Sequence, residues 1–389
     1  MTNPRSIQHT PSSPEWDALI AFASPHWAVE RLNATLHAPL DWSVLLARAE
    51  EHGVLPMMAA RLQERAFSPA LPEIRSKLEA WQRAQSIFTL TLTAHLFKTL
   101  DHLAAVGIEG LVTKGPVLSV RCYGGAWMRQ YVDLDLIVRA RDIERVTQVM
   151  LQLRYEPRIP LGAVQAARIP GEYTFISKDR KVVFEFHTER TLRYHPRPLP
   201  IDKLFQRQAA VPVDGRNVPT PSLEDELVLI CIHGAKHFWE RLVWIADVGA
   251  LLSRQSLDWD RALAVAREVG ADRILRLGLR LPADLLGANL PPQFEEKVRA
   301  DRTVAKLAAH IESRLAHSDL PPIGIVQRAA FRIQMRGSLL SGIAYLLRLT
   351  LSPTEEDWTV GKEGHRSTFI EAMGRPLRLA RKHSRGETK

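Results

Sequence analysis

The sequence predicts an α+β fold, in which a small mixed sheet is flanked by N-terminal and C-terminal helical regions. Strand-like alternation is confined to residues 107–200, while residues 14–106 and 201–320 have helical periodicity. A proline-rich stretch at 194–200 separates the strands from the second helical region. The chain has 389 residues, 46% hydrophobic and 24% charged, so it is long enough for sizeable cores and has an ordinary globular composition.

The N-terminal part is expected to be a leader followed by a helical domain. Residues 1–13 contain no apolar run of the kind that marks a secretion signal, so they are expected to be flexible. Residues 14–106 are predicted to form the helical domain. The apolar residues at helical spacing include Leu78, Trp81, Ile87, Leu90, Leu92 and Leu96.

The central segment, residues 107–200, is predicted to contain the sheet. An amphipathic helix is expected at Asp142–Leu153, with Asp142 as its N-cap. The expected strands lie near Ile108–Val112, Val132–Val138, Tyr173–Ser177 and Val182–Phe186.

Two of these strands carry acidic residues. Because side chains alternate along a strand, Asp133 and Asp135 share one face, and Glu185 and His187 share a face of the later strand. Two carboxylates about 7 Å apart on an apolar strand are unfavourable unless a cation lies between them. If the strands are neighbours, Glu185 joins the pair, and three carboxylates suit two Mg²⁺ ions, or Mn²⁺ in their place. The pattern favours nucleotidyl transfer.

The chain resembles a bacterial nucleotidyltransferase family within the DNA polymerase beta superfamily, from about residue 42 to residue 381. The motifs that carry the resemblance are, in order, Lys114-Gly115, Tyr123-Gly124, Arg129, Asp133-Leu134-Asp135 and Glu185-Phe186-His187. The resemblance implies that Asp133, Asp135 and Glu185 are the catalytic metal ligands and that the turn at Lys114-Gly115 binds phosphate.

The turn departs from the superfamily pattern, because Lys114-Gly115-Pro116 stands where Gly-Ser is usual. The serine contact to phosphate is therefore missing, and Lys114 could supply charge instead. Lys114 could equally be a surface lysine. Arg129 has two readings as well: an ion pair with Asp133, or a bidentate contact with phosphate.

The second helical region, residues 201–320, is predicted to cover the cleft. Ser222 is a predicted N-cap. His233, Lys236 and His237 are expected to line the nucleotide or acceptor site, with Trp239 or Trp244 stacking on a base. The alternative is that the histidines and tryptophans are packing residues. Zinc is disfavoured, because Gly234 stands where a zinc hydrolase needs Glu.

Residues 321–389 are predicted to form a helical extension with a basic tail. The net charge of +9 favours anionic partners in general. The apolar run Leu339–Leu351 is shorter than the roughly 20 residues that span a bilayer, so no transmembrane segment is expected and peripheral attachment is the lesser alternative. With Cys122 and Cys231 as the two cysteines, a reducing cytoplasm is predicted.

The predicted function is Mg²⁺-dependent transfer of a nucleoside monophosphate, from a triphosphate such as ATP to an unidentified acceptor. The acceptor could be a small molecule, glycan, peptide or protein. One alternative is a catalytically inactive nucleotide-binding or scaffold protein with the same fold, which the altered turn favours. Another is a toxin-like enzyme that modifies RNA ends, which the basic tail favours; nucleic acid is a less favoured partner.

Overall fold

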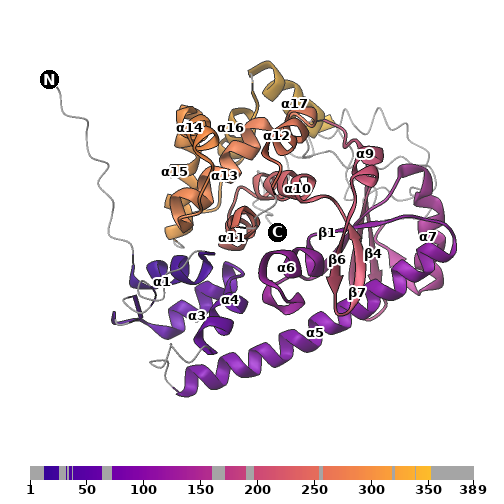
Figure 1. Ribbon diagram of the computed structural model, residues 1–389, viewed down its shortest axis with the longest axis horizontal. Coiled ribbons are helices and arrows are strands. Elements are labelled where there is room, and N and C mark those ends of the chain that lie inside the picture. The colour runs from indigo at the N-terminus through magenta and orange to yellow at the C-terminus, as the bar shows by residue number, and fades with distance from the viewer. Residues whose placement is uncertain are drawn as a thin grey trace.

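The computed structural model contains the predicted α+β architecture, with one small sheet set among many helices (Figure 1). It describes residues 13–25, 32, 35–36, 38–63, 72–159, 171–189, 197–253, 257–317, 320–337 and 339–351. The leader at 1–12 and the basic tail beyond residue 351 lie outside the described residues. No helix in the described ranges is both long and apolar enough to cross a membrane.

The main sheet has five strands in the order β1-β2-β5-β4-β3. The strands are β1 (Leu111–Thr113), β2 (Asp133–Ile137), β3 (Tyr155–Pro157), β4 (Glu172–Ser177) and β5 (Val183–His187). β2 and β5 are parallel and the other pairs are antiparallel, so the sheet is mixed as predicted. Strand β3 was not expected, because three residues are too few to show alternation.

One face of this sheet is covered by two helices. Leu134 and Leu136 of β2 and the phenylalanines of β5 share an apolar core with the long helix α5 (Pro72–Ala105) and with α7 (Ile143–Gln152). In Figure 1, α5 runs along the lower edge from the N-terminal helices to the sheet. The opposite face carries the polar residues of β2 and β5. Since side chains alternate along a strand, the register that buries the apolar residues on one face also places the polar residues on the other.

Two sequence expectations about helices need correction. Ile87 and Leu90 are exposed, because they lie on a different side of α5 from the buried Leu92 and Leu96. Asp142 precedes α7 but makes no capping hydrogen bond; it accepts from Arg145 instead.

A second core joins helices from both ends of the chain. The N-terminal helices are α1 (Pro14–Ala23), α3 (Trp42–Glu51) and α4 (Leu55–Gln63). They share their buried residues with a C-terminal set. This set comprises α10 (Leu223–Lys236), α11 (Leu242–Ser253), α12 (Trp259–Glu268), α13 (Asp272–Leu286), α14 (Pro292–Ala300) and α15 (Arg302–Ala316). Cys122 and Cys231 are both free and buried.

The remaining elements link these cores. Helix α6 (Gly115–Tyr123) follows β1 and contacts α11 and the hairpin β6 (Ala209–Val213) and β7 (Arg216–Thr220). This hairpin and the short α9 (Ile201–Gln206) begin the segment 201–320, for which only helices were expected. Two further helices, α16 (Ile325–Gln334) and α17 (Leu339–Leu351), pack on each other.

Helix α10 has the predicted N-cap and an apolar contact that requires glycine. Ser222 accepts a hydrogen bond from the backbone N–H of Asp225. Near the other end of α10, the fully buried Trp239 lies against Gly234. A Cβ atom added at Gly234 would lie 2.5 Å from Cζ3 of Trp239, closer than atoms can approach. The absence of glutamate at position 234 therefore has a packing reason.

Gly234→Ala is predicted to lower the free energy of unfolding by about 1–3 kcal/mol, because the indole ring must shift within a packed core. Alanine in a helix normally has the opposite effect, so the sign is diagnostic. Chemical denaturation measures the change. The control is Gly337→Ala, where an added Cβ would have no neighbour within 4 Å; its effect should stay within about 0.5 kcal/mol. A stabilised Gly234→Ala protein would contradict this packing argument.

Candidate active site

The parallel pairing of β2 with β5 brings the predicted acids together on the face of the sheet that α5 and α7 leave open. Asp135 stands opposite Glu185 in the register. Ligand atoms of Asp135, Glu185 and His187 all lie within 4.8 Å of one another. Asp133 precedes Asp135 by two positions on β2, and both aspartates line one cavity, which is described below. Oxygen atoms with one imidazole nitrogen form a donor set that suits Mg²⁺ or Mn²⁺.

Asp135 is the most buried member of this cluster, with 2% of its side chain exposed. Its Oδ1 atom lies 2.8 Å from Lys114 Nζ and 2.7 Å from His187 Nε2. Burial alone would raise the pKa of Asp135, but the Lys114 ammonium and His187 outweigh it and hold that pKa well below its usual range. Asp135 is therefore ionised at neutral pH.

The pKa values of the two partners of Asp135 shift in the opposite direction. Burial lowers the pKa of Lys114 and of His187, yet the Asp135 carboxylate overcomes this and raises both. The three groups thus form a buried cluster in which the Asp135 carboxylate has two basic partners. A metal ion bound at Asp135 would compete with Lys114 for the same oxygen.

The other two acids are held nearer to their neutral form. Burial raises the pKa of Glu185 to about 7, and the neighbouring Asp135 and Glu172 add to the rise. Burial and Asp135 likewise raise the pKa of Asp133. A carboxyl group poised near neutral pH can exchange a proton, which a general base requires.

The turn between β1 and α6 has an unusual backbone. Lys114 has φ 54° and ψ −143°, a region that residues other than glycine rarely adopt, and Gly115 follows with φ 43°. Glu226 of α10 supports this turn, since its carboxylate accepts from the Lys114 backbone N–H at 3.1 Å and from Thr113 Oγ1. Non-glycine backbone held in a sparsely populated region is frequent at functional sites.

The same turn opens helix α6. Gly115 stands at its N-terminus, where unpaired backbone N–H groups favour an anion. Pro116 follows and has no N–H, so one donor is lost as well as the serine hydroxyl. Lys114 Nζ is the remaining strong donor at this turn.

Arg129 does not form the predicted ion pair with Asp133. Its Nε atom donates to Asp247 Oδ2 of α11 at 2.9 Å, and both side chains are almost fully buried. Tyr123 also donates to Asp247, at 2.9 Å. Asp133 is therefore not the structural partner of Arg129. Gly124, next to Tyr123, has φ 88° and ends α6, which explains the Tyr-Gly pair.

A wall of aromatic rings faces the acids from α10 and α11. Trp244 lies 5.5 Å from His233 and 5.1 Å from His237, measured between ring centroids. Burial lowers the pKa of His233 well below its usual range and that of His237 to about 4. Both histidines are therefore neutral at pH 7 and can serve as hydrogen-bonding or stacking groups rather than as cations.

The two tryptophans that were predicted to stack on a base lie in different surroundings. Trp244 lines the cavity beside Asp133 and Asp135, whereas Trp239 is fully buried in the helical core. Stacking of Trp239 on a base is therefore excluded by its burial. Lys236 also faces the sheet, with Nζ 3.8 Å from Glu172 Oε2 of β4.

Two cavities contain nearly all of the predicted site residues. The larger, of about 410 Å³, is lined by Lys114, Gly115, Arg129, Asp133, Asp135, His233 and His237. The smaller, of about 60 Å³, is lined in part by Lys114, His187, His233 and Lys236. Lys114 and His233 belong to both cavities, so these adjoin each other. Glu185 is not among the lining residues of either cavity; it stands opposite Asp135 on β5, and its Oε2 atom lies 3.9 Å from His187 Nε2.

Sequence reasoning missed the residues that support this site. They are Thr113, Glu172, Glu226 and Asp247; Tyr123 belonged to a predicted motif, but its hydrogen bond to Asp247 was not expected. Glu226 lies among the acids of a first helical turn, which is also how a solvated helix start looks. Asp247 in the strongly apolar α11 was the available signal, because a buried acid needs a partner.

Asp247→Leu is predicted to destabilise the protein by about 3–5 kcal/mol, because it leaves the Arg129 guanidinium buried without its carboxylate. The double variant Arg129→Met/Asp247→Leu should recover much of this loss, since it removes the stranded charge. Urea denaturation of both variants measures the difference. A double variant as unstable as the single one would show that the ion pair is not the cause.

Comparison with known proteins agrees with the motifs. Residues 38–287 match a family described as uncharacterised nucleotidyltransferase. The match ends at residue 287, short of the residue 381 that the motif resemblance included. No curated protein matches the sequence significantly.

Two solved structures are similar to this chain. The lincosamide antibiotic adenylyltransferase LnuA, with lincomycin bound, is 16% identical over 41% of this chain and 94% of its own, with a TM-score of 0.28. An antigenic nucleotidyltransferase-like protein from Paracoccidioides brasiliensis is 14% identical over 53% of this chain and 93% of its own, with a TM-score of 0.29. The family match is the stronger finding, because it spans more than half of the chain. The protein belongs to this nucleotidyltransferase family.

Proposed function

We propose that the protein transfers a nucleoside monophosphate from a nucleoside triphosphate to an acceptor hydroxyl or phosphate, in a Mg²⁺-dependent reaction. The observation that carries the proposal is the cluster of Asp135, Glu185 and His187, with Asp133 beside Asp135 in the cavity that Gly115 of α6 also lines. Carboxylates next to an anion-binding turn combine the two functions that the chemistry needs.

Asp133, Asp135 and Glu185 would hold the metal ions, and His187 is a further donor within reach. Bound Mg²⁺ supplies positive charge to the triphosphate and to the attacking oxygen. Asp135 is ionised and deeply buried, so it would be the strongest of these ligands. Asp133, which also lines the larger cavity and is less buried than Asp135, would face the triphosphate.

Lys114 would exchange its ion pair with Asp135 for an ion pair with a phosphate group of the substrate. Its Nζ atom balances Asp135 in the structure described above. With nucleotide bound, the Lys114 ammonium would bind a phosphate oxygen and stabilise the departing pyrophosphate. The turn at Gly115 would present backbone N–H groups to the same phosphates.

Glu185 is the proposed general base. Its pKa of about 7 lets it accept a proton from an acceptor hydroxyl near neutral pH. Asp135 cannot fill this role, because its pKa is far too low. As a metal ligand Glu185 would be ionised, so it would be available to take up the proton of the attacking hydroxyl.

The 410 Å³ cavity would hold the nucleotide, with Trp244 and the neutral His233 and His237 beside the base or the ribose. Arg129 would position the residues around it rather than contact a phosphate with its charge, since its Nε atom donates to Asp247. Lys236, close to Glu172, would meet the acceptor side. The acceptor is proposed to be a small molecule, glycan, peptide or protein.

The proposal is tested by calorimetric titration of each nucleoside triphosphate with and without Mg²⁺. Asp133→Ala/Asp135→Ala is expected to weaken the Mg²⁺-dependent binding by about 100-fold or more, because even groups that only orient a metal ligand contribute about 10- to 100-fold. The matched control is Glu144→Ala/Glu156→Ala, which removes two exposed acids from α7 and β3. It should bind as the unchanged protein does.

Three results would count against the proposal. If no triphosphate binds, the inactive scaffold alternative becomes the better description. If binding is unchanged in the double variant, the acids are not metal ligands. Binding that is equally weakened in the control would indicate a general effect of charge.

The affinity for Mg²⁺ is predicted to fall as the pH is lowered from about 8 to about 6, approaching tenfold per pH unit at the acid end. The sign follows from the raised pKa of Glu185: below about 7 this ligand is protonated, and the proton must leave before metal binds. Calorimetry in two buffers of different ionisation enthalpy would detect that proton. In Glu185→Gln, affinity should be lower and its pH dependence weaker; an unchanged slope would remove Glu185 from the ligand set.

A further inference from the structure

A second large cavity lies among the C-terminal helices, away from the acids. It has a volume of about 1000 Å³ and is lined by residues of α12 to α15 and by Gly337 and Ser341 at the α16–α17 junction. None of its lining residues lines either cavity of the candidate active site. It is therefore a separate site.

The described lining of this cavity is strongly basic. It contains only two carboxylates, those of Asp272 and Asp301. Its cationic residues are Arg197, Arg267, Arg273, Arg276, Lys297 and Arg302. We refer to it as the basic cavity. Cations gathered in a concave site focus a positive potential, which attracts anions.

Some of these cations have a structural function. Asp301 accepts from Arg276 at 2.9 Å and from Arg273 at 3.3 Å, and also caps α15. Arg276 bonds to Asp272 as well, and Arg273 donates to the carbonyl of Gln334 at 2.9 Å. These bonds fix the floor of the basic cavity in place. They also occupy both of its carboxylates.

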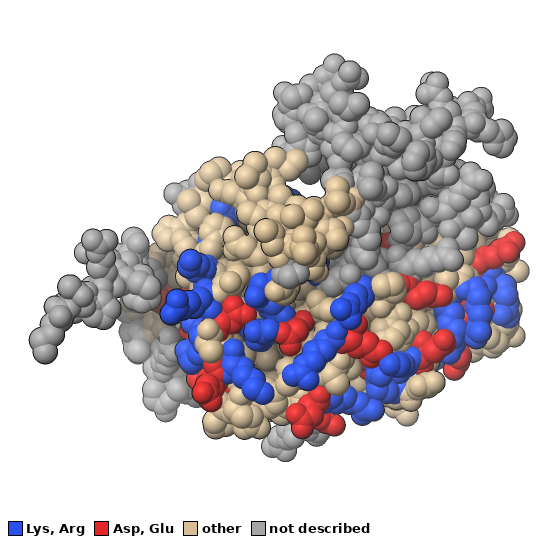
Figure 2. Space-filling view, turned by 90° about the horizontal axis from the view of Figure 1, so that it is seen from above, with Lys and Arg blue, Asp and Glu red and all other residues tan. Residues whose placement is uncertain are grey.

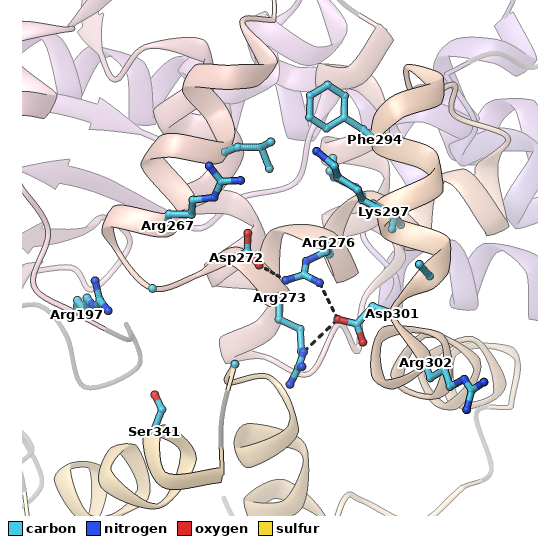
Figure 3. A pocket seen from close by; sticks show the side chains of 16 residues that line it. Arg197, Arg267, Asp272, Arg273, Arg276, Phe294, Lys297, Asp301, Arg302 and Ser341 are labelled. Atoms are coloured by element: carbon cyan, nitrogen blue, oxygen red, sulfur yellow. Dashed lines mark hydrogen bonds and ion pairs between the residues drawn. The ribbon is translucent and has the colours of Figure 1, made fainter.

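Arg197 donates to the carbonyl of Glu268 at 3.4 Å, whereas the three remaining cations, all exposed, lack such partners in the part of the chain that the structure describes. Among the described residues, Arg267, Lys297 and Arg302 have no carboxylate within 4.0 Å. Figure 3 shows Arg267 of α12 and Lys297 of α14 extending toward the same space, with Arg276 below them. The Lys297 ammonium lies 5.8 Å from the centre of the Phe294 ring, which stacks on Trp259. Phe294 lines the cavity, so this stack supports part of its wall.

From this arrangement we propose that the basic cavity binds a small molecule that carries several phosphate groups. Its volume is at the upper end of the roughly 300–1,000 Å³ that ligand pockets occupy. Guanidinium and ammonium donors around one space suit phosphate oxygens, and guanidinium binds them bidentately. The proposal does not depend on the nucleotidyl-transfer function.

A small ligand fits the surface better than a polynucleotide does. On the face seen in Figure 2, Lys and Arg side chains alternate with Asp and Glu, and the described part of that face has no continuous positive band. A nucleic acid needs such a band to follow its backbone. The basic groups are instead concentrated where the surface is hollow.

Calorimetric titration with inorganic tripolyphosphate, without Mg²⁺, tests the proposal. Arg267→Gln/Lys297→Gln is expected to weaken binding by about tenfold for each charge removed. The matched control is Arg261→Gln/Lys306→Gln, which removes two exposed charges from α12 and α15 outside the basic cavity. It should bind almost as the unchanged protein does. Orthophosphate, with a single phosphate group, should bind far more weakly.

Further arms separate this site from the active site. Lys114→Gln should keep tripolyphosphate binding, and Arg267→Gln/Lys297→Gln should keep Mg²⁺-dependent nucleotide binding and its melting temperature. The proposal is overturned if tripolyphosphate affinity is unchanged in Arg267→Gln/Lys297→Gln or equally reduced in the control. The proposal is also overturned, in favour of a nucleic-acid surface, if single-stranded RNA binds more tightly than tripolyphosphate and Arg267→Gln/Lys297→Gln abolishes that binding.

Discussion

The register between β2 and β5 is the constraint on which the rest of the structure depends. It sets Asp135 opposite Glu185 and places both on the face that α5 and α7 leave uncovered. A shift by one residue would turn Phe184 and Phe186 outward and bury the acids in an apolar core, which is strongly unfavourable. The apolar side of these strands therefore holds the reactive side in alignment.

Three carboxylates cannot be concentrated in this way without compensation from other elements. Lys114 and His187 neutralise Asp135, while Glu226 stabilises the backbone turn from which Lys114 extends. Arg129, Asp247 and Tyr123 link α6 to α11 beneath the aromatic wall. The site is thus a set of mutually dependent charges, and burial makes each of them costly to leave alone.

The fold class and the acids of the site could be predicted, since both depend on local patterns. Alternation along Val132–Val138 located Asp133 and Asp135, and the spacing of Ser222 and Asp225 located the start of α10. The partner of Arg129 could not be predicted, because Asp247 is 118 residues further along the chain. Trp239 and Trp244 look equivalent in the sequence, and only tertiary packing buries one of them and leaves the other beside the cavity.

Helix α10 takes part in the site at both of its ends, and this affects how the chain can be divided. Glu226 in its first turn supports the Lys114 turn, and His233 and Lys236 near its last turn form part of the wall. The five strands of the main sheet and the acids Asp133, Asp135 and Glu185 precede residue 200, so a fragment ending there would retain every proposed metal ligand. It would nevertheless lack the carboxylate that accepts the Lys114 backbone N–H. The proline-rich boundary at 194–200 is therefore a boundary of composition and not of an autonomous catalytic unit.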